Sequence, residues 1–534
     1  MSMPLLISSI IKHAARYHGD TEVVSRRIEG DLHRYNYREC ELRAKQLVNA
    51  LVALGVRAGD RIGTLAWNGY RHLEIYYAVS GMGAVCHTVN PRLFHDQIVY
   101  IVNHAEDQYV FFDLTFLPLV ESLAPRCPKV KGWVLMSDRA HMPQSSQLNL
   151  LCYEEQLDAR PDQYEWPELD ENLASSLCYT SGTTGNPKGA LYSHRSTLLH
   201  SYATSLPDGF GCSALDVILP IVPMFHANAW GLPYSTPLVG AKLVLPGAKL
   251  DGESILELME QEKVTFSAGV PTVWLALLQH MQKVGGRFST FRRAIVGGAA
   301  CPPALSKALS DLDVEAIHSW GMTEMSPAGT TGKLLNKHLG LTKEQRLSVL
   351  ERPGRVLFGV DMKIVDERGN ELPWDGKARG DLLVRGPWVI DRYFREEASA
   401  LKDGWFPTGD FATIDADGYV QITDRSKDVI KSGGEWISSI EIEKIAAAHP
   451  AVLMAACIAC RHPKWDERPL LVVMRKPDAK LSREELLGFY QGKVAKWWIP
   501  DDVVFVDEIP MTATGKMLKL KLREIFRDYR LPTE

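Results

Sequence analysis

The sequence predicts an α/β fold with two stacked α/β sheets, followed by a small β-barrel or meander and then by a compact α+β unit. Strand-like and helical hydrophobic patterns alternate over residues 37–135 and again over 216–318, which is typical of βαβ units in a mostly parallel sheet. Short strands with tight turns begin at Gly354, and helix-capping signals follow residue 424. A chain of 534 residues exceeds a single core, so we expect at least two domains.

The first run of alternating patterns opens with a helix at 37–54, where apolar residues from Leu42 to Leu54 recur at helical spacing. Before it, residues 1–11 are apolar but too short to span a membrane, and they are interpreted as an amphipathic first helix. The remaining elements of this run are expected as strands at 61–66, 84–89, 109–112 and 130–135, and as helices at 71–80, 95–104 and 115–123.

The second run predicts the second α/β sheet. Its strand at 294–296 leads into Gly297 and the small residues up to Cys301. Pro302-Pro303 then opens a helix, because proline is tolerated in a first helical turn. The other elements are expected as strands at 216–222, 242–245, 264–268 and 314–318, and as helices at 251–261 and 271–281.

The pattern of strand and helix signals changes twice in the C-terminal part of the chain. Residues 354–424 carry short strands separated by turns, which predicts a small β-barrel or meander. The capping boxes that begin at Ser438 and Ser482 start helices of an α+β unit. Strands are expected at 362–365, 382–384, 419–422, 452–459 and 470–474. The predicted organisation is an N-terminal domain of residues 1–424, a hinge at 425–427 and a C-terminal domain of residues 428–534.

Composition narrows the class of protein. An apolar share of 46% and a charged share of 23% are those of a soluble globular protein. A net charge of −5 argues against a nucleic-acid partner, which favours a basic face. Nine cysteines, an odd and scattered set, suit a reducing cytoplasm. Cys457 and Cys460 have a redox-like spacing but lie in an apolar run, so we interpret them as buried thiols.

A glycine-rich loop between Leu177 and Gly189 is the strongest functional signal. It follows an apolar strand, and its glycines leave backbone N–H groups uncovered, which together with four hydroxyl side chains form an anion-binding concavity. Lys188 adds a cation. The loop lacks the Gly-Lys-Ser/Thr ending of a Walker loop. A flexible linker is the plain alternative, but a linker needs neither Lys188 nor the preceding strand, so the loop predicts a polyphosphate site.

Four further clusters of residues each give a weaker functional signal when considered alone. After the strand that ends near His318, Trp320 can stack on a base, Thr323 can bond a phosphate and Glu324 can hold Mg²⁺, although a strand-end aromatic with a solvated glutamate is the plain alternative. The other three clusters also resemble ordinary turns or solvated charged loops. They are the Thr-Gly-Asp sequence ending at Asp410, the charged segment from Asp424 to Glu435 with its glycine pair, and the Thr-Gly-Lys sequence ending at Lys516.

Together and in this order, the five motifs resemble the adenylate-forming superfamily of acyl-CoA synthetases, firefly luciferase and peptide-synthetase adenylation domains. The resemblance covers nearly the whole chain. The segments Pro223–His226, Gly297–Cys301 and Lys427–Trp436 are most similar to bacterial medium-chain fatty-acyl-CoA synthetases. The resemblance implies a large N-terminal domain of two α/β subdomains plus a small β-barrel, and a mobile C-terminal α+β lid.

The resemblance also implies a reaction. ATP and a carboxylic acid form an acyl-adenylate and release pyrophosphate, and coenzyme A (CoA) then displaces AMP to give a thioester. Lys516, Lys431, Glu324 and Thr184 are the implied catalytic residues, with Glu324 and Thr184 at Mg²⁺, and Lys427 is the implied hinge. Implied nucleotide contacts are Thr180, Ser181, Gly182, Thr183, Thr184, Gly185, Lys188, Gly298, Ala299, His318, Trp320, Gly321, Met322, Thr323, Asp410 and Arg425. The CoA tunnel is implied at Ser432, Gly433, Gly434 and Glu435.

The acyl pocket is implied at Phe225, His226, Trp230, Gly298 and Ala299, where a bulky Trp230 favours short or medium chains, unless it is an ordinary core residue. A medium-chain fatty acid is the expected substrate, and a short thioether acid, a branched acid or an aromatic acid is the alternative. A luciferase-like oxygenase and a non-catalytic nucleotide-binding module are the competing functions. We expect a cytoplasmic enzyme without stable membrane insertion, and a homodimer is left open.

Overall fold

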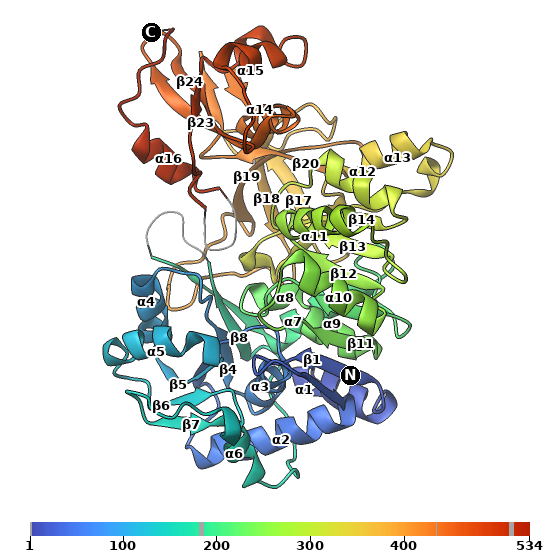
Figure 1. Cartoon of the computed structure of the whole chain (residues 1–534), viewed down its shortest axis with the longest axis vertical. Coiled ribbons are helices and arrows are strands. Elements are labelled where there is room, and N and C mark those ends of the chain that lie inside the picture. Colours follow the sequence, from blue (N-terminus) through green and yellow to red (C-terminus); the bar gives the residue numbers. More distant parts are fainter. Residues whose placement is uncertain (1–2, 181–185, 434, 512–516, 534) are drawn as a thin grey trace. The chain divides into compact units, whose positions relative to one another are not determined.

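The computed structural model describes residues 3–180, 186–433, 435–511 and 517–533, and these divide into two compact units (Figure 1). The first unit comprises residues 1–361 and 385–406, and the second comprises residues 362–384 and 407–534. The structure therefore does not describe residues 181–185, 434 and 512–516. Within the described residues, no helix is long and apolar enough to cross a bilayer.

The first unit contains a seven-stranded sheet in the order β7-β6-β5-β3-β4-β8-β9. The strand pairings in this sheet are parallel except that of β8 with β9, which is antiparallel. The parallel sheet expected from residues 37–135 is thus confirmed. Its strands are β3 (Arg61–Leu65), β4 (Val85–Thr88), β5 (Asp107–Phe112), β6 (Gly132–Leu135), β7 (Leu150–Cys152), β8 (Ala174–Tyr179) and β9 (Gly189–Ser193).

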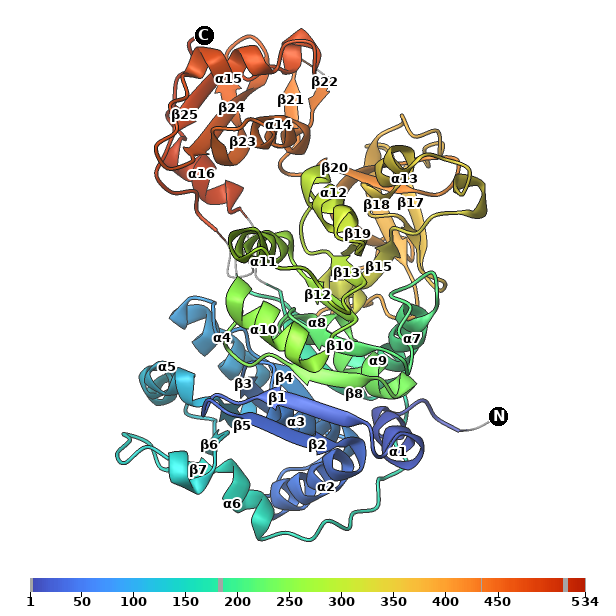
Figure 2. The same ribbon diagram turned by 45° about the vertical axis from the view of Figure 1, so that its right-hand side comes forward.

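The second sheet of this unit has nine strands in the order β16-β15-β14-β13-β12-β10-β11-β1-β2, with a parallel centre and antiparallel edges (Figure 2). It confirms the second expected α/β sheet. The strands are β1 (Glu22–Arg26), β2 (Leu32–Asn36), β10 (Val217–Pro220), β11 (Lys242–Leu245), β12 (Phe266–Gly269), β13 (Arg293–Val296), β14 (Glu315–Gly321), β15 (Ala328–Thr331) and β16 (Arg355–Val356).

Helices cover both sheets. The helix α3 (Tyr70–Gly81) is buried along its whole length and contacts strands of both sheets, and its charged residues Arg71 and Glu74 are paired with Glu29 and Arg43. The other helices of the first unit are α1 (Ile7–Tyr17), α2 (Tyr37–Ala53), α4 (His95–Ala105), α5 (Leu117–Leu123), α6 (Tyr153–Asp158), α7 (His194–Ser205), α8 (Ala227–Trp230), α9 (Leu232–Val239), α10 (Gly252–Glu262), α11 (Pro271–Val284), α12 (Pro303–Asp311) and α13 (Lys343–Leu350).

A core of aliphatic and aromatic side chains supports the nine-stranded sheet under α10, α11 and α12. At its centre the fully buried Trp274 donates its indole N–H toward the carbonyls of Gly269 (3.0 Å) and Ile295 (3.2 Å). A buried indole needs such a partner. These bonds fix the ends of β12 and β13, which are the strands that lead into the site described below.

The second unit contains two sheets. Residues 361–425 form a four-stranded sheet in the order β17-β18-β19-β20, so the described strands take the form of the expected meander, and no barrel closure is recorded among them. Its strands are β17 (Asp361–Val365), β18 (Gly380–Arg385), β19 (Phe406–Ile414) and β20 (Val420–Arg425). The other sheet comprises β21 (Ile430–Ser432), β22 (Glu435–Ile437), β23 (Val452–His462), β24 (Asp466–Arg475) and β25 (Asp502–Phe505), with helices α14 (Ser439–Ala447), α15 (Arg483–Phe489) and α16 (Lys519–Ile525).

Ser438 and Ser482 are the N-caps of α14 and α15, each accepting from a backbone N–H three residues later, as the capping boxes predicted. A buried ionic cluster joins the elements of this unit. The Lys519 ammonium lies 2.7 Å from Glu443 and donates to the hydroxyl of Ser439, which in turn donates to Asp424 at the end of β20. The ion pair and the hydrogen bonds around it offset part of the cost of burying these charges.

All nine cysteines are free and buried. Cys457 and Cys460 lie in β23, and burial raises the pKa of the Cys457 thiol well above its ordinary value. A thiol of this kind is poorly nucleophilic. The prediction that these two cysteines are structural core residues therefore agrees with their position in the fold.

Candidate active site

The glycine-rich loop connects two strands that pair directly. Tyr179, the last residue of β8, is opposite Gly189, the first residue of β9, and the Thr180 N–H donates to the Lys188 carbonyl (2.9 Å). The loop is therefore closed at its base. Of the predicted phosphate contacts, Thr180 and Lys188 are described and lie side by side, whereas Ser181, Gly182, Thr183, Thr184 and Gly185 lie outside the described residues.

Lys188 has two partners beyond the loop. Its ammonium lies 3.1 Å from the Glu396 carboxylate and 4.7 Å from the centroid of the Tyr393 ring. The side chains of Lys188 and Glu396 are both about half exposed. In such a solvated pair the attraction is modest, so a phosphate group can replace Glu396 as the partner of the lysine.

Two neighbouring parallel strands bring the next set of residues together. Val296 at the end of β13 is opposite His318 in β14, so Gly297 and Gly298 leave the sheet beside Ser319 and Trp320. Ligands of open α/β sheets bind at the carboxyl ends of parallel strands. The predicted contacts Gly298, Ala299, His318, Trp320, Gly321, Met322 and Thr323 therefore share one edge of the nine-stranded sheet.

The turn after β14 depends on tight packing. A Cβ at Gly321 would lie 1.9 Å from the Pro327 carbonyl oxygen, so only glycine fits there. The His318 Nδ1–H donates to the Glu351 carbonyl (2.8 Å), which fixes the ring within the protein. The turn carries Glu324, which is buried and whose Oε1 accepts a hydrogen bond from the Tyr393 hydroxyl (2.8 Å). A carboxylate held in this way is a suitable ligand for a hard cation.

The predicted acyl-pocket segment has an unusual backbone. Four consecutive non-glycine residues, Ala227 to Trp230, have positive φ angles of 42°, 51°, 47° and 56°. Such residues cost about 1–2 kcal/mol each. Asn228 compensates by donating to the Ser176 hydroxyl (2.9 Å) and by accepting at Oδ1 from Tyr76 (3.3 Å) and Cys178 (3.4 Å).

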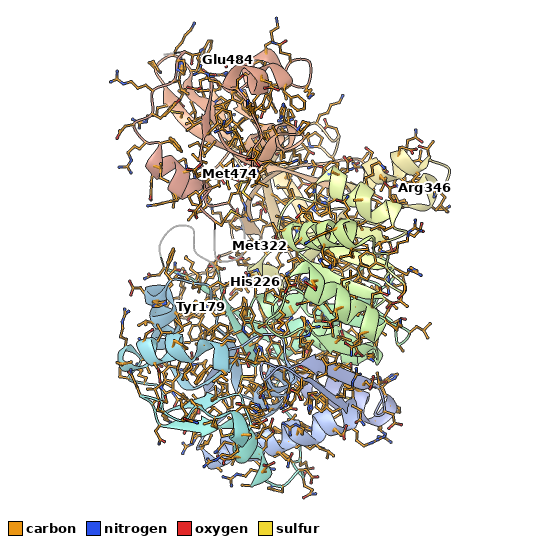
Figure 3. The ribbon with its side chains drawn as sticks, in the orientation of Figure 1. Tyr179, His226, Met322, Arg346, Met474 and Glu484 are labelled. Atoms are coloured by element: carbon orange, nitrogen blue, oxygen red, sulfur yellow. The ribbon has the colours of Figure 1, made fainter. Side chains whose placement is uncertain are left out.

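This left-handed turn places Trp230 against the end of β13. A Cβ at Gly297 would lie 3.0 Å from the Trp230 ring, and one at Gly298 would lie 3.7 Å from it. Trp230 therefore lies beside Gly298, another residue of the predicted acyl pocket. Phe225 is buried and its ring is 5.9 Å from that of Trp67. Figure 3 shows His226, which precedes the turn, together with Tyr179 and Met322.

The second unit holds the other predicted site residues. Asp410 and Arg425 are opposite each other on β19 and β20, and the Arg425 Nε lies 2.9 Å from the buried Asp410 carboxylate. Lys427 is exposed just after β20. The Lys431 ammonium lies 4.4 Å from the Trp436 ring centroid and 3.5 Å from Glu367.

A cavity of about 490 Å³ adjoins the predicted CoA loop. Gly433 adopts a φ of +60° and packs under Trp465, because a Cβ on it would lie 2.9 Å from that ring. Glu435 begins β22, whereas Gly434 and Lys516 lie outside the described residues. The cavity is lined by Ser432, Gly433, Trp465, Arg468, Trp497, Asp501 and Thr533. Sequence reasoning missed Trp465 and Trp497, since neither belongs to a recognisable motif.

Among the described residues, one group of three side chains could also hold a metal ion, namely Glu29, Asp138 and His141. Two arginines already neutralise the negative charge of this group. Arg71 lies 2.7 Å from Glu29, and Arg27 lies 3.2 Å from Asp138. Their positive charges oppose a further cation, so this group offers no better metal site than Glu324.

A glycine-rich segment between paired strands, a buried carboxylate shortly after β14 and two α/β sheets are typical of a nucleotide-dependent enzyme, and the chain belongs to the AMP-binding enzyme family. The family model matches residues 11–394, and that of the AMP-binding enzyme C-terminal domain matches residues 441–516. The protein is an ATP-dependent acid–CoA ligase that acts through an acyl-adenylate, as its relatives indicate.

Two relatives are similar over almost their whole length. The 3-methylmercaptopropionyl-CoA ligase of Ruegeria lacuscaerulensis is 54% identical and covers 99% of this chain and 98% of its own. The medium-chain-fatty-acid–CoA ligase of Ectopseudomonas oleovorans is 52% identical with the same coverage. A crystal structure of the anthranilate CoA ligase AuaEII with anthranoyl-AMP has a TM-score of 0.87 at 26% identity, covering 99% of this chain and 98% of that one.

Proposed function

We propose that the protein activates a short to medium, unbranched carboxylic acid for transfer to CoA. The observation that carries the proposal is the contact of Trp230 with Gly297 and Gly298. An indole that covers the end of β13 limits the depth available to an acyl chain there. A medium-chain fatty acid is the first candidate, and the name of the Ectopseudomonas oleovorans relative supports it. A short thioether acid is the second, supported by two Ruegeria relatives named for 3-methylmercaptopropionate.

The two chemical steps divide a difficult acyl transfer. A carboxylate is a poor electrophile, whereas its mixed anhydride with AMP has a good leaving group, so the CoA thiol can displace AMP and form the thioester. In the first step Lys188, with the loop hydroxyls, would hold the outgoing phosphates, and Lys516 would neutralise charge between the carboxylate and the α-phosphate. Preorganised charges of this kind stabilise the transition state without reorganisation.

Mg²⁺ is the third partner in this proposal. Glu324 suits it, because its carboxylate is buried and already oriented by Tyr393. When bound, the ion would neutralise phosphate charge as pyrophosphate leaves. Thr184 would be its second ligand. Trp320 would stack on the base, and Asp410 would accept from the ribose hydroxyls.

For the second step we propose that CoA uses the cavity beside Ser432 and Gly433, with Lys431 serving the thioester reaction and Lys427 acting as the hinge. Trp465 and Trp497 are each about 40% exposed, at 43% and 41%, and exposed aromatic faces suit the stacking of a nucleotide base. Arg468 keeps Ser432 in place by donating to its hydroxyl (3.2 Å). A cytoplasmic location is part of the proposal and is supported by nine free, buried thiols. Sedimentation velocity would measure whether the enzyme is a monomer or a homodimer.

The test is ATP-dependent pyrophosphate release with acids of three to sixteen carbons and with 3-methylmercaptopropionate, each with and without CoA. We expect kcat/KM to be highest for short to medium acids and AMP release to require CoA. The variant Trp230→Ala should shift the preference toward longer acids. An unchanged preference in that variant would refute the role of Trp230, and an optimum at aromatic acids would refute the substrate class.

A further inference from the structure

The segment Trp388–Glu396, between β18 and β19, contacts both halves of the phosphate-binding region of the first unit. On one side it binds the turn that carries Glu324. The Ile390 N–H donates to the Glu324 carbonyl (2.9 Å), and the Trp388 indole N–H donates to the Ala328 carbonyl (3.0 Å). These bonds fix the backbone at Glu324 and four residues after it.

On its other side the same segment binds the exit of the glycine loop. The Phe394 N–H donates to the Gly189 carbonyl (2.7 Å), and the Glu396 carboxylate lies 3.1 Å from the Lys188 ammonium. A Cβ on Gly189 would lie 3.0 Å from the Phe394 Cβ, so the two backbones are in close contact. The segment therefore connects two motifs that lie more than a hundred residues apart in the sequence.

Tyr393 stands between these two sets of contacts and touches a side chain of each. Its hydroxyl donates to Glu324 Oε1 (2.8 Å), and its ring centroid lies 4.7 Å from the Lys188 ammonium. The ring also packs edge-on against Phe406.

We propose that Tyr393 is a positioning residue for adenylation, one that orients the Glu324 carboxylate with its hydroxyl and the Lys188 ammonium with its ring. This inference rests on the proposed roles of Glu324 and Lys188 toward Mg²⁺ and phosphate. A carboxylate offers about four lone-pair sites, so a hydrogen bond to Oε1 is compatible with ligation of a cation. A neutral ring attracts the lysine without repelling a phosphate, whereas Glu396 must be displaced when the phosphate binds.

The variant Tyr393→Phe separates the two contacts, because it removes the hydroxyl and retains the ring. Loss of a hydrogen bond to a charged group corresponds to roughly a tenfold effect or more. We expect the Mg²⁺ concentration for half-maximal pyrophosphate release to rise about tenfold, with the KM for the acid unchanged. Conversion of supplied acyl-adenylate to thioester should match that of the wild type.

Tyr393→Leu removes both contacts and should in addition raise the KM for ATP by about threefold, because a cation–π contact at an exposed site is weak. Tyr202→Phe is the matched control. Tyr202 lies on α7 with 47% exposure, so loss of its hydroxyl should change neither value. Glu396→Gln should leave the Mg²⁺ requirement unchanged, since Glu396 contacts only the lysine side of the pair.

A binding measurement makes the test independent of turnover. Calorimetry of ATP binding with and without Mg²⁺ gives the gain in affinity due to the metal, and Tyr393→Phe should lose most of this gain while retaining its affinity for metal-free ATP. Equal metal dependence in Tyr393→Phe and wild type would overturn the proposal, as would a lower melting temperature with no shift in the Mg²⁺ requirement. Wild-type enzyme that releases no pyrophosphate with any acid would refute the proposed function instead, and calorimetry would still decide the role of Tyr393.

Discussion

The Asp410 carboxylate lies 2.9 Å from Nε of Arg425, its direct neighbour across the β19–β20 pair. Asp410 is 2% exposed, and a buried carboxylate requires paired or hydrogen-bonded neighbours, of which Arg425 is one. The arginine thus supplies a positive charge directly beside the buried carboxylate. The two residues were predicted separately, from a Thr-Gly-Asp turn and from the charged hinge segment, and their pairing unites them in one local arrangement.

We therefore expect Asp410→Asn to raise the KM for ATP by roughly ten- to a hundredfold, since a hydrogen bond to a charged group is lost and Arg425 is left without its counter-charge. The KM for CoA should stay unchanged. The exposed pair of Arg385 and Asp361, which lie 2.8 Å apart, supplies the control, and Asp361→Asn should have little effect. Steady-state kinetics with each substrate varied in turn would check this, and a normal KM for ATP in Asp410→Asn would contradict the assignment.

His200 leads to a prediction about pH. It is 1% exposed, its Nε2 accepts from the Ala328 N–H (3.1 Å), and burial lowers its pKa to about 3. An unfolded histidine has a pKa near 6.5 and binds a proton that the folded one does not, so this residue stabilises the fold above pH 6.5 and loses that contribution as the pH falls toward 3. At pH 5 the loss is about 2 kcal/mol.

The variant His200→Gln should therefore be less stable than wild type at pH 7, where an acceptor and packing are lost, yet should approach it as the pH is lowered to 5. Urea unfolding at several pH values would measure the difference between the two curves. Gly231 lies under the ring, because a Cβ on it would be 2.8 Å from His200, so a larger replacement is unsuitable. If the free energy of unfolding changes with pH in the same way in both proteins, the pKa of His200 does not differ between the folded and unfolded states.

The sequence was sufficient to predict the two sheets because their strands are uniform apolar runs separated by amphipathic helices. It was insufficient for the β1–β2 hairpin, although the hairpin extends the nine-stranded sheet. Strand β1 of this hairpin pairs with β11, and Val23 lies opposite Leu243. No local pattern indicates a pairing over more than two hundred residues, since the hydrophobic pattern specifies an element and not its neighbour.

The sequence indicates candidate site residues where they stand in short motifs, and it carries no signal for residues that come together only through tertiary contacts. Glu324 and Lys188 stand in short motifs, whereas Tyr393 lies in a segment with no recognisable motif and meets both only through the tertiary fold. The left-handed turn from Ala227 to Trp230 opposes local preference, because non-glycine residues rarely adopt it. The hydrogen bonds that Asn228 makes with Ser176 and Cys178 of β8 and with Tyr76 of α3 hold this turn.

Gly433 provides a test of the CoA loop. Its φ of +60° and its close contact with Trp465 both exclude a side chain. Gly433→Ala should therefore displace the Trp465 ring from the cavity and raise the KM for CoA by about tenfold or more, given a strain of roughly 1–3 kcal/mol, while pyrophosphate release without CoA stays near normal. Gly285→Ala is a matched control, because Gly285 also has a positive φ (+67°) but no atom within 4 Å of an added Cβ. Equal effects of both variants on the two half-reactions would point to general destabilisation.

Lys516 and Lys427 should separate the two half-reactions in opposite directions. Lys516→Ala removes the proposed cation between carboxylate and α-phosphate, and loss of one preorganised charge costs about 2.7–4 kcal/mol, or roughly 10²–10³ in rate. Adenylation should fall by that factor, whereas thioester formation from supplied acyl-adenylate should persist. Lys427→Pro fixes φ at the proposed hinge, so it should slow thioester formation and spare adenylation. Single-turnover assays of each step would measure both, and equal loss of the two steps in either variant would refute the role proposed for that lysine.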